Sequence, residues 1–105
     1  MISSGGENVF PDEIESVYGE ATAIDQISVV GIPDERWGAV PVAFLSFKSG
    51  ETMDFDSLRT FGRERLAHYK VPARFFVTDN FPRTASGKIQ RHKLRDQLAE
   101  AREIK

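Results

Sequence analysis

Residues 26–48 read "QISVVGIPDERWGAVPVAFLSFK", and the arrangement of the chain can be worked outward from this segment. Its two ends, 26–33 and 39–48, are rich in β-branched and aromatic residues, whereas "DERWG" between them is polar. This pattern predicts two strands joined by a turn. Pro41 favours an edge position or a strand start for the second strand, because proline has no N–H to give to a sheet.

A helix is predicted before this pair of strands. In "PDEIESVYGE" (11–20), Pro11 suits a first helical position. The apolar residues Ile14, Val17 and Tyr18 recur at the spacing of one helical face. That face would pack on the sheet.

The part of the chain after the strands adds further elements. "MDFDSLRTFGRERLAHY" (53–69) predicts a helix with Asp54 as its N-cap. "ARFFVTD" (73–79) predicts a third strand, and "QRHKLRDQLAEAR" (90–102) predicts a third helix. The order helix, two strands, helix, strand, helix predicts an α+β fold: a small mixed sheet with about three helices packed on it, in a single compact domain over 1–105.

Composition limits the compartment and the kinds of site. The chain has no cysteine, which excludes disulfides and cysteine-based zinc sites and fits a reducing compartment. The opening "MISSGGENVF" lacks the basic and apolar regions of a signal peptide, and no apolar run is long enough for a membrane span. We therefore expect a cytoplasmic protein.

Charge is unevenly distributed along the chain. The net charge is −2, yet residues 1–35 carry eight acidic groups and no lysine or arginine. Basic residues begin at Arg36 and concentrate in the last third. This asymmetry fits a surface that meets an anion, and it fits equally two solvated faces of opposite sign.

A lysine in the C-terminal part is a candidate for chemistry. Lys88 lies in "FPRTASGKIQRHKLR" (81–95). A phosphate-binding P-loop would need glycine at Pro82 and serine or threonine at Ile89, so that interpretation fails. What remains is an ammonium group on a mobile loop. It could stabilise a carboxylate or phosphate oxygen in a transition state, or it could be an ordinary solvated lysine.

Three other segments have two interpretations each. "SSGGEN" (3–8) could let a ligand approach its flexible backbone amides, or it could be a turn before the first helix. Trp37 could stack on a planar ligand or cover the edge of the core. Tyr69 with Lys70 and Arg74 could bind a nucleotide's base and phosphates, or could end a helix. The two histidines lie far apart in sequence, and no metal site is predicted.

Together these segments resemble a known family. "MISSGGENVFPDEIE", "VVGIPDERWGAVPVAF", "LRTFGRERL" and "LAHYKVPARFFVTDNFPRTASGKIQRHKLR" occur in this order. They are similar to the C-terminal domain of the AMP-forming acyl-CoA synthetases, in the adenylate-forming superfamily, from Met1 to about Leu98. "GGEN" with "ERWG" looks more like bacterial fatty-acyl or aryl-acid CoA ligases than like the other branches.

The resemblance implies a two-step reaction. A carboxylic acid and Mg-ATP first form an acyl-adenylate and pyrophosphate, with Lys88 holding carboxylate and phosphate oxygens together. The domain then rotates, and the CoA thiol attacks the adenylate. The resemblance places a loop beside the thiol channel that comprises Ser4, Gly5, Gly6, Glu7 and Asn8.

The resemblance also implies a site for CoA. Trp37 and Tyr69 would flank the adenine. Members of the family often carry basic residues for the CoA phosphates where this chain has Val71 and Ala73. Lys70 and Arg74 are the cations that could replace them.

The partners follow from the same resemblance. The large N-terminal adenylation domain, with the acid pocket and the Mg²⁺ ligands, is absent, and the hinge would fall just before Met1. ATP, CoA and the acid are then substrates shared with that domain, and this chain alone should be inactive. Nucleic acid is not an expected partner. The alternative is a free-standing anion- or protein-binding regulatory module that docks through Arg83–Arg95.

Overall fold

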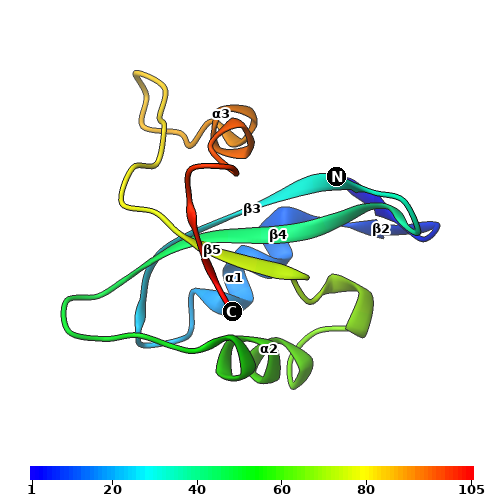
Figure 1. Cartoon of the computed structure of the whole chain (residues 1–105), viewed down its shortest axis with the longest axis horizontal. Helices are drawn as coiled ribbons and strands as arrows, with labels where there is room; N and C mark the ends of the chain where they lie inside the picture. The colour runs from blue at the N-terminus through cyan, green and yellow to red at the C-terminus, as the bar shows by residue number, and fades with distance from the viewer.

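A four-stranded mixed sheet forms the centre of the computed structural model, which describes residues 1–105 (Figure 1). Its strands lie in the order β3 (Ile24–Asp34), β4 (Gly38–Phe47), β5 (Arg74–Val77) and β6 (Arg102–Ile104). β3 and β4 are antiparallel, β4 and β5 are parallel, and β5 and β6 are antiparallel. The predicted α+β fold with a mixed sheet is confirmed.

Helices cover both faces of the sheet. Helices α1 (Pro11–Tyr18) and α2 (Phe55–Arg63) share one face, and α3 (Arg91–Asp96) packs on the other. Successive strand residues point to opposite faces, so β3, β4 and β5 each supply residues to both cores. The larger core includes Ile14, Tyr18, Val29, Ala43, Leu45, Leu58 and Phe75. The smaller core includes Val30, Val42, Phe44, Phe76 and Leu94. None of the helices has the length and apolar character needed to cross a membrane.

Tyr18 connects α1 to α2 inside the larger core. Its hydroxyl donates a hydrogen bond of 2.7 Å to the carbonyl of Leu58, and burial raises the pKa of Tyr18 to about 12. Gly62 lies against the same hydroxyl, where a larger side chain would overlap it. Glycine in the last turn of α2 is therefore a packing requirement.

The N-terminal segment is a β-hairpin, and "SSGGEN" contains its turn, as the interpretation of a turn before the first helix predicted. Strands β1 (Ile2–Ser4) and β2 (Glu7–Val9) pair antiparallel around a two-residue turn. Gly5 and Gly6 have φ of +57° and +84°, which the favoured two-residue hairpin turn requires. Ile2 and Val9, which pair at the open end of the hairpin, are buried in the larger core.

The second predicted helix is shorter than expected. Asp54 is its N-cap as predicted, and its carboxylate accepts a 2.8 Å hydrogen bond from the N–H of Ser57. α2 ends at Arg63 instead of continuing to residue 69, and a separate 3₁₀ helix, η1 (His68–Lys70), follows. The residue before Pro72 is extended, as the proline ring demands, so the chain leaves the helical path ahead of β5.

The third predicted helix is also shorter. α3 ends at Asp96, not at residue 102; turns follow over 97–100, and β6 begins at Arg102, the last residue of the predicted helix. Ile104 lies opposite Phe75 in the sheet. Pairing with the open edge of β5 thus accounts for a strand that the sequence pattern did not predict.

Pro41 lies in a central strand and not at an edge. Its carbonyl accepts a 2.9 Å hydrogen bond from the N–H of Ala73, on the side where β5 begins. The parallel ladder starts only at the next residue, Val42 opposite Arg74. The missing N–H of proline therefore falls just before the ladder, which resolves the conflict with a central position.

Candidate functional site

The loop that carries Lys88 is closed by hydrogen bonds. Arg83 and Ile89 form an antiparallel bridge. The N–H of Thr84 donates to the carbonyl of Lys88 at 2.8 Å, and the N–H of Gly87 donates back to Thr84 at 2.9 Å. Gly87 has φ of +90°, which permits the tight turn. The segment is a small hairpin that projects from the sheet beside α3 (Figure 1).

Side chains stiffen this hairpin further. The hydroxyl of Thr84 accepts from the N–H of Lys88 at 3.2 Å and lies 2.9 Å from the hydroxyl of Ser86. The guanidinium of Arg83 donates to the carbonyl of Gly87 at 2.9 Å and also to the side-chain oxygen of Gln26. The ammonium of Lys88 is different, because it is exposed and forms no ion pair.

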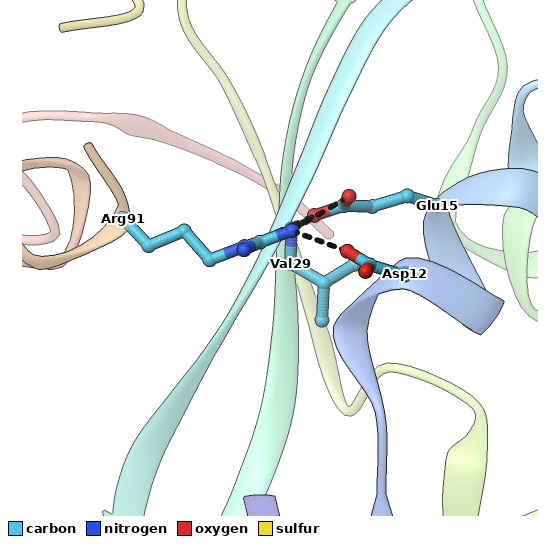
Figure 2. A network of polar contacts seen from close by, with 4 residues as sticks. All are labelled: Asp12, Glu15, Val29 and Arg91. Carbon is cyan, nitrogen blue, oxygen red and sulfur yellow. Dashed lines mark hydrogen bonds and ion pairs between the residues drawn. The ribbon is translucent and has the colours of Figure 1, made fainter. Parts of the chain in front are cut away.

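Arg91, just after the Lys88 hairpin, forms ion pairs with α1. Figure 2 shows its side chain reaching from α3 toward two carboxylates on α1. Its Nη2 lies 2.9 Å from Oδ1 of Asp12 and 2.8 Å from Oε1 of Glu15. Oε2 of Glu15 accepts a 2.8 Å hydrogen bond from the N–H of Val29 in β3. Burial lowers the pKa of Arg91, but the hydrogen bonds and charges of Glu15 and Asp12 outweigh burial and hold that pKa above its ordinary value.

A second site is lined by residues of the N-terminal hairpin, the β3–β4 turn and η1. Figure 1 shows that the N-terminal hairpin and the β3–β4 turn lie away from the hairpin beside α3. The second site is a pocket of about 440 Å³. Five of the predicted site residues line it, namely Ser4, Gly5, Glu7, Trp37 and Tyr69. The fold thus brings together residues from three separate segments. Gly6 and Asn8 of the same loop are not among the lining residues.

The backbone around Trp37 holds its indole at the pocket. The carboxylate of Asp34 accepts from the N–H groups of Arg36 and Trp37, at 3.0 and 2.9 Å. The carbonyl of Trp37 accepts a 2.8 Å hydrogen bond from Gly5. The ring lies so close to Gly5 that a Cβ there would be 2.7 Å from it. Trp37 is nevertheless 47% exposed, so the indole does not belong to the core.

Lys70 and Arg74, the two predicted phosphate ligands, lie outside the pocket lining and have carboxylate partners. Nζ of Lys70 is 2.9 Å from Glu13, and the hydrogen bond that Lys70 donates to this carboxylate raises the pKa of Lys70. Arg74 donates two hydrogen bonds, of 2.8 and 3.0 Å, to Glu103. These bonds raise the pKa of Arg74 and lower the pKa of Glu103.

Two lining residues were missed in the sequence. Arg59 and His68 both border the pocket. Arg59 donates a 2.8 Å hydrogen bond to the carbonyl of Pro72, while its buried Nε–H has no partner. Nothing in the local pattern marks Arg59, because its position depends on how the segment after α2 folds back. No cluster of three or more potential metal ligands is present.

Comparison with known proteins establishes the family. The family described as "AMP-binding enzyme C-terminal domain" matches residues 13–88. The chain belongs to this family. The resemblance found in the sequence is therefore confirmed, and the AMP-binding enzyme C-terminal domain accounts for most of the chain.

Relatives and solved structures agree with that assignment. A 2-succinylbenzoate–CoA ligase from Listeria monocytogenes is 47% identical over 97 residues, which are 92% of this chain and 20% of the relative. A double mutant of o-succinylbenzoate CoA synthetase from Bacillus subtilis, bound to a product analogue, superimposes with a TM-score of 0.89 and 41% identity, over 97% of this chain and 20% of that one. A Mycobacterium tuberculosis fatty acyl CoA synthetase superimposes with a TM-score of 0.85 and 37% identity, over 95% of this chain and 20% of that one.

The extent of these matches defines what the chain corresponds to. The chain spans about a fifth of the length of the curated relatives it matches. Those relatives are CoA ligases, and the match is to their C-terminal domain. This chain thus corresponds to the C-terminal part of proteins that are CoA ligases. It carries the Lys88 hairpin and, apart from it, the pocket lined by Trp37 and Tyr69.

Proposed function

We propose that this domain serves both half-reactions of an ATP-dependent, AMP-forming acid–CoA ligase. The overall reaction joins a carboxylic acid to CoA and converts ATP to AMP and pyrophosphate. The observation that carries the proposal is the unpaired ammonium of Lys88 on a hydrogen-bonded hairpin, far from a pocket lined by Trp37 and Tyr69. Two separated sites suit a domain that presents one end and then the other to the same reaction centre.

Lys88 would act in the first half-reaction. A carboxylate oxygen attacks the α-phosphorus of ATP, forms the new P–O bond, and expels pyrophosphate. Both reactants are anions that repel each other, and negative charge builds on the phosphate oxygens as they meet. An exposed ammonium with no carboxylate of its own can neutralise that charge. The Mg²⁺ that accompanies ATP would be held by the N-terminal domain, the partner that completes the site.

The aromatic pocket would act in the second half-reaction. The thiol sulfur of CoA attacks the acyl carbon, AMP leaves, and the thiol proton passes to solvent. The adenine of CoA would lie between Trp37 and Tyr69, since planar bases stack on aromatic rings. The turn from Ser4 to Asn8, with its backbone amides, would border the thiol channel. Lys70 and Arg74 could bind CoA phosphates only by exchanging their present carboxylate partners.

The relatives support a class of acid for this proposal. Ligases for 2-succinylbenzoate and for fatty acyl groups both resemble the chain, so we infer an aryl or fatty carboxylic acid. A cytoplasmic location fits an enzyme that consumes ATP and CoA.

The decisive experiment separates the two half-reactions in the full-length enzyme. Lys88→Ala should lower ATP–pyrophosphate exchange by about 10²- to 10³-fold, the usual loss for one transition-state charge contact. Thioester formation from acyl-adenylate made beforehand should change little. Lys93→Ala, on the exposed side of α3, is the matched control and should leave both rates unchanged. Equal losses in both half-reactions would contradict the role given to Lys88, and no loss in either would favour the binding-module alternative.

A further inference from the structure

A second pocket lies directly beside Lys88. It measures about 360 Å³ and is bordered by Lys88, Arg91 and the acidic residues Asp12 and Glu15, among others. An exposed ammonium and two carboxylates therefore share one small polar space. Such groups would normally attract each other, yet Lys88 pairs with neither carboxylate.

The two carboxylates already have a partner. Figure 2 shows the guanidinium of Arg91 facing the carboxylates of both Asp12 and Glu15. Nη2 of Arg91 lies 2.8 Å from both oxygens of Glu15 and 2.9 Å from Asp12. Oε2 of Glu15 also accepts the N–H of Val29 at 2.8 Å. The acceptor positions of Glu15 are therefore largely filled, and Oδ1 of Asp12 is also occupied.

Geometry favours the arginine in this competition. A planar guanidinium can donate several hydrogen bonds to carboxylates at once, whereas an ammonium acts as a strongly hydrated point charge. The side chain of Glu15 is only 20% exposed, so its pair with Arg91 is shielded from solvent more than a surface pair would be. Lys88 gains less by leaving water for the same carboxylates.

We propose that Arg91 is a positioning residue that keeps Lys88 available by occupying Asp12 and Glu15. When Arg91 is absent, the ammonium of Lys88 turns into the pocket and pairs with these carboxylates. The importance of that availability for adenylation rests on the proposed function, but the competition itself does not. It is a property of the 105-residue chain and can be measured there.

The test is the rate at which Lys88 is acetylated by trace acetic anhydride, read by peptide mass spectrometry. Exposed Lys48 provides the internal reference within each sample. In Arg91→Gln, the ratio of Lys88 to Lys48 acetylation should fall about two- to fivefold, the range expected for one exposed ion pair. Adding Asp12→Asn and Glu15→Gln to Arg91→Gln should restore the ratio. A purely structural tether predicts instead an unchanged or higher ratio in Arg91→Gln, with no restoration.

A second variant keeps the test valid if Arg91→Gln does not fold. Asp12→Asn with Glu15→Gln, in the presence of Arg91, should leave Lys88 acetylation unchanged, because these carboxylates are already occupied. A clear increase would overturn the proposal, since it would mean that they already hold Lys88.

The same variants separate this inference from the proposed function. In the full-length enzyme, Arg91→Gln should lower ATP–pyrophosphate exchange and spare thioester formation, with the triple variant recovering. If acetylation responds as expected but Lys88→Ala leaves adenylation intact, the proposed function fails and the competition stands. If Lys88→Ala abolishes adenylation but Arg91→Gln leaves the acetylation of Lys88 unchanged, the competition fails and the proposed function stands.

Discussion

Gly5→Ala should disturb the aromatic pocket through one contact. A Cβ on Gly5 would lie 2.7 Å from Cε3 and 3.2 Å from Cζ3 of Trp37. Ordinary van der Waals contact begins at 3.4 Å, so the indole must move by roughly 0.7 Å. The hydrogen bond from the N–H of Gly5 to the carbonyl of Trp37 opposes this movement, because it holds the two backbones together.

Gly6→Ala is the matched control. Gly5 and Gly6 both have positive φ, so alanine at either position is strained by roughly 1–2 kcal/mol. A Cβ on Gly6, however, would meet nothing within 4 Å. Both variants should therefore lose a similar amount of stability from the backbone, and only Gly5→Ala should displace the ring of Trp37.

The assay uses the only tryptophan of the chain. Acrylamide quenching of Trp37 should increase in Gly5→Ala and stay near the wild-type value in Gly6→Ala. In the full-length enzyme, the affinity for CoA should fall about fivefold in Gly5→Ala, which corresponds to roughly 1 kcal/mol of lost aromatic stacking. If the two variants gave the same quenching and the same affinity, the contact between Gly5 and Trp37 would not be what positions the ring.

Two further predictions concern stability. Gly62→Ala should destabilise the domain by about 1–3 kcal/mol in chemical unfolding, because the new Cβ displaces the Tyr18 hydroxyl from its hydrogen bond; in a Tyr18→Phe background the loss should be smaller, and an equal loss would contradict the mechanism. The hydrogen bonds from Ser57 lower the pKa of Asp54 below its ordinary 3.8. The stability that the Asp54 carboxylate adds is therefore fully present above pH 3.8 and is lost as the pH falls through the folded-state pKa of Asp54. Melting curves should show wild type losing more stability than Asp54→Asn on acidification below pH 3.8, and parallel losses would rule out this role.

The elements that local sequence predicts well are those with complete local signals. Asp54 shows this, because an N-cap depends on residues within one turn. The antiparallel pair β3–β4 was predictable for the same reason, from β-branched runs flanking a polar turn. The hairpin at Gly5–Gly6 also carried a local signal that was overlooked, since two adjacent glycines between short extended segments favour a tight turn.

The remaining features depend on distant partners. β6 forms because Ile104 meets the open edge of β5, and nothing within residues 97–105 indicates that edge. Arg59 reaches the aromatic pocket only because the chain folds back after α2. The carboxylate partners of Lys70 and Arg74 lie 57 and 29 residues away in the sequence. These ion pairs could therefore not be predicted from the residues around the two cations. Residue types at the site were predictable, but their pairing was not.

The hydrogen bond between Glu15 and Val29 also has a consequence for solubility. β3 is an outer strand of the sheet, and outer strands with free N–H groups can pair with other molecules and start aggregation. The carboxylate of Glu15 occupies the N–H of Val29, in the middle of that strand, and places a charge along its rim. A strand from another copy would have to displace this carboxylate before it could pair there. By covering this part of β3, Glu15 of α1 thus opposes pairing of the strand with another copy of the chain.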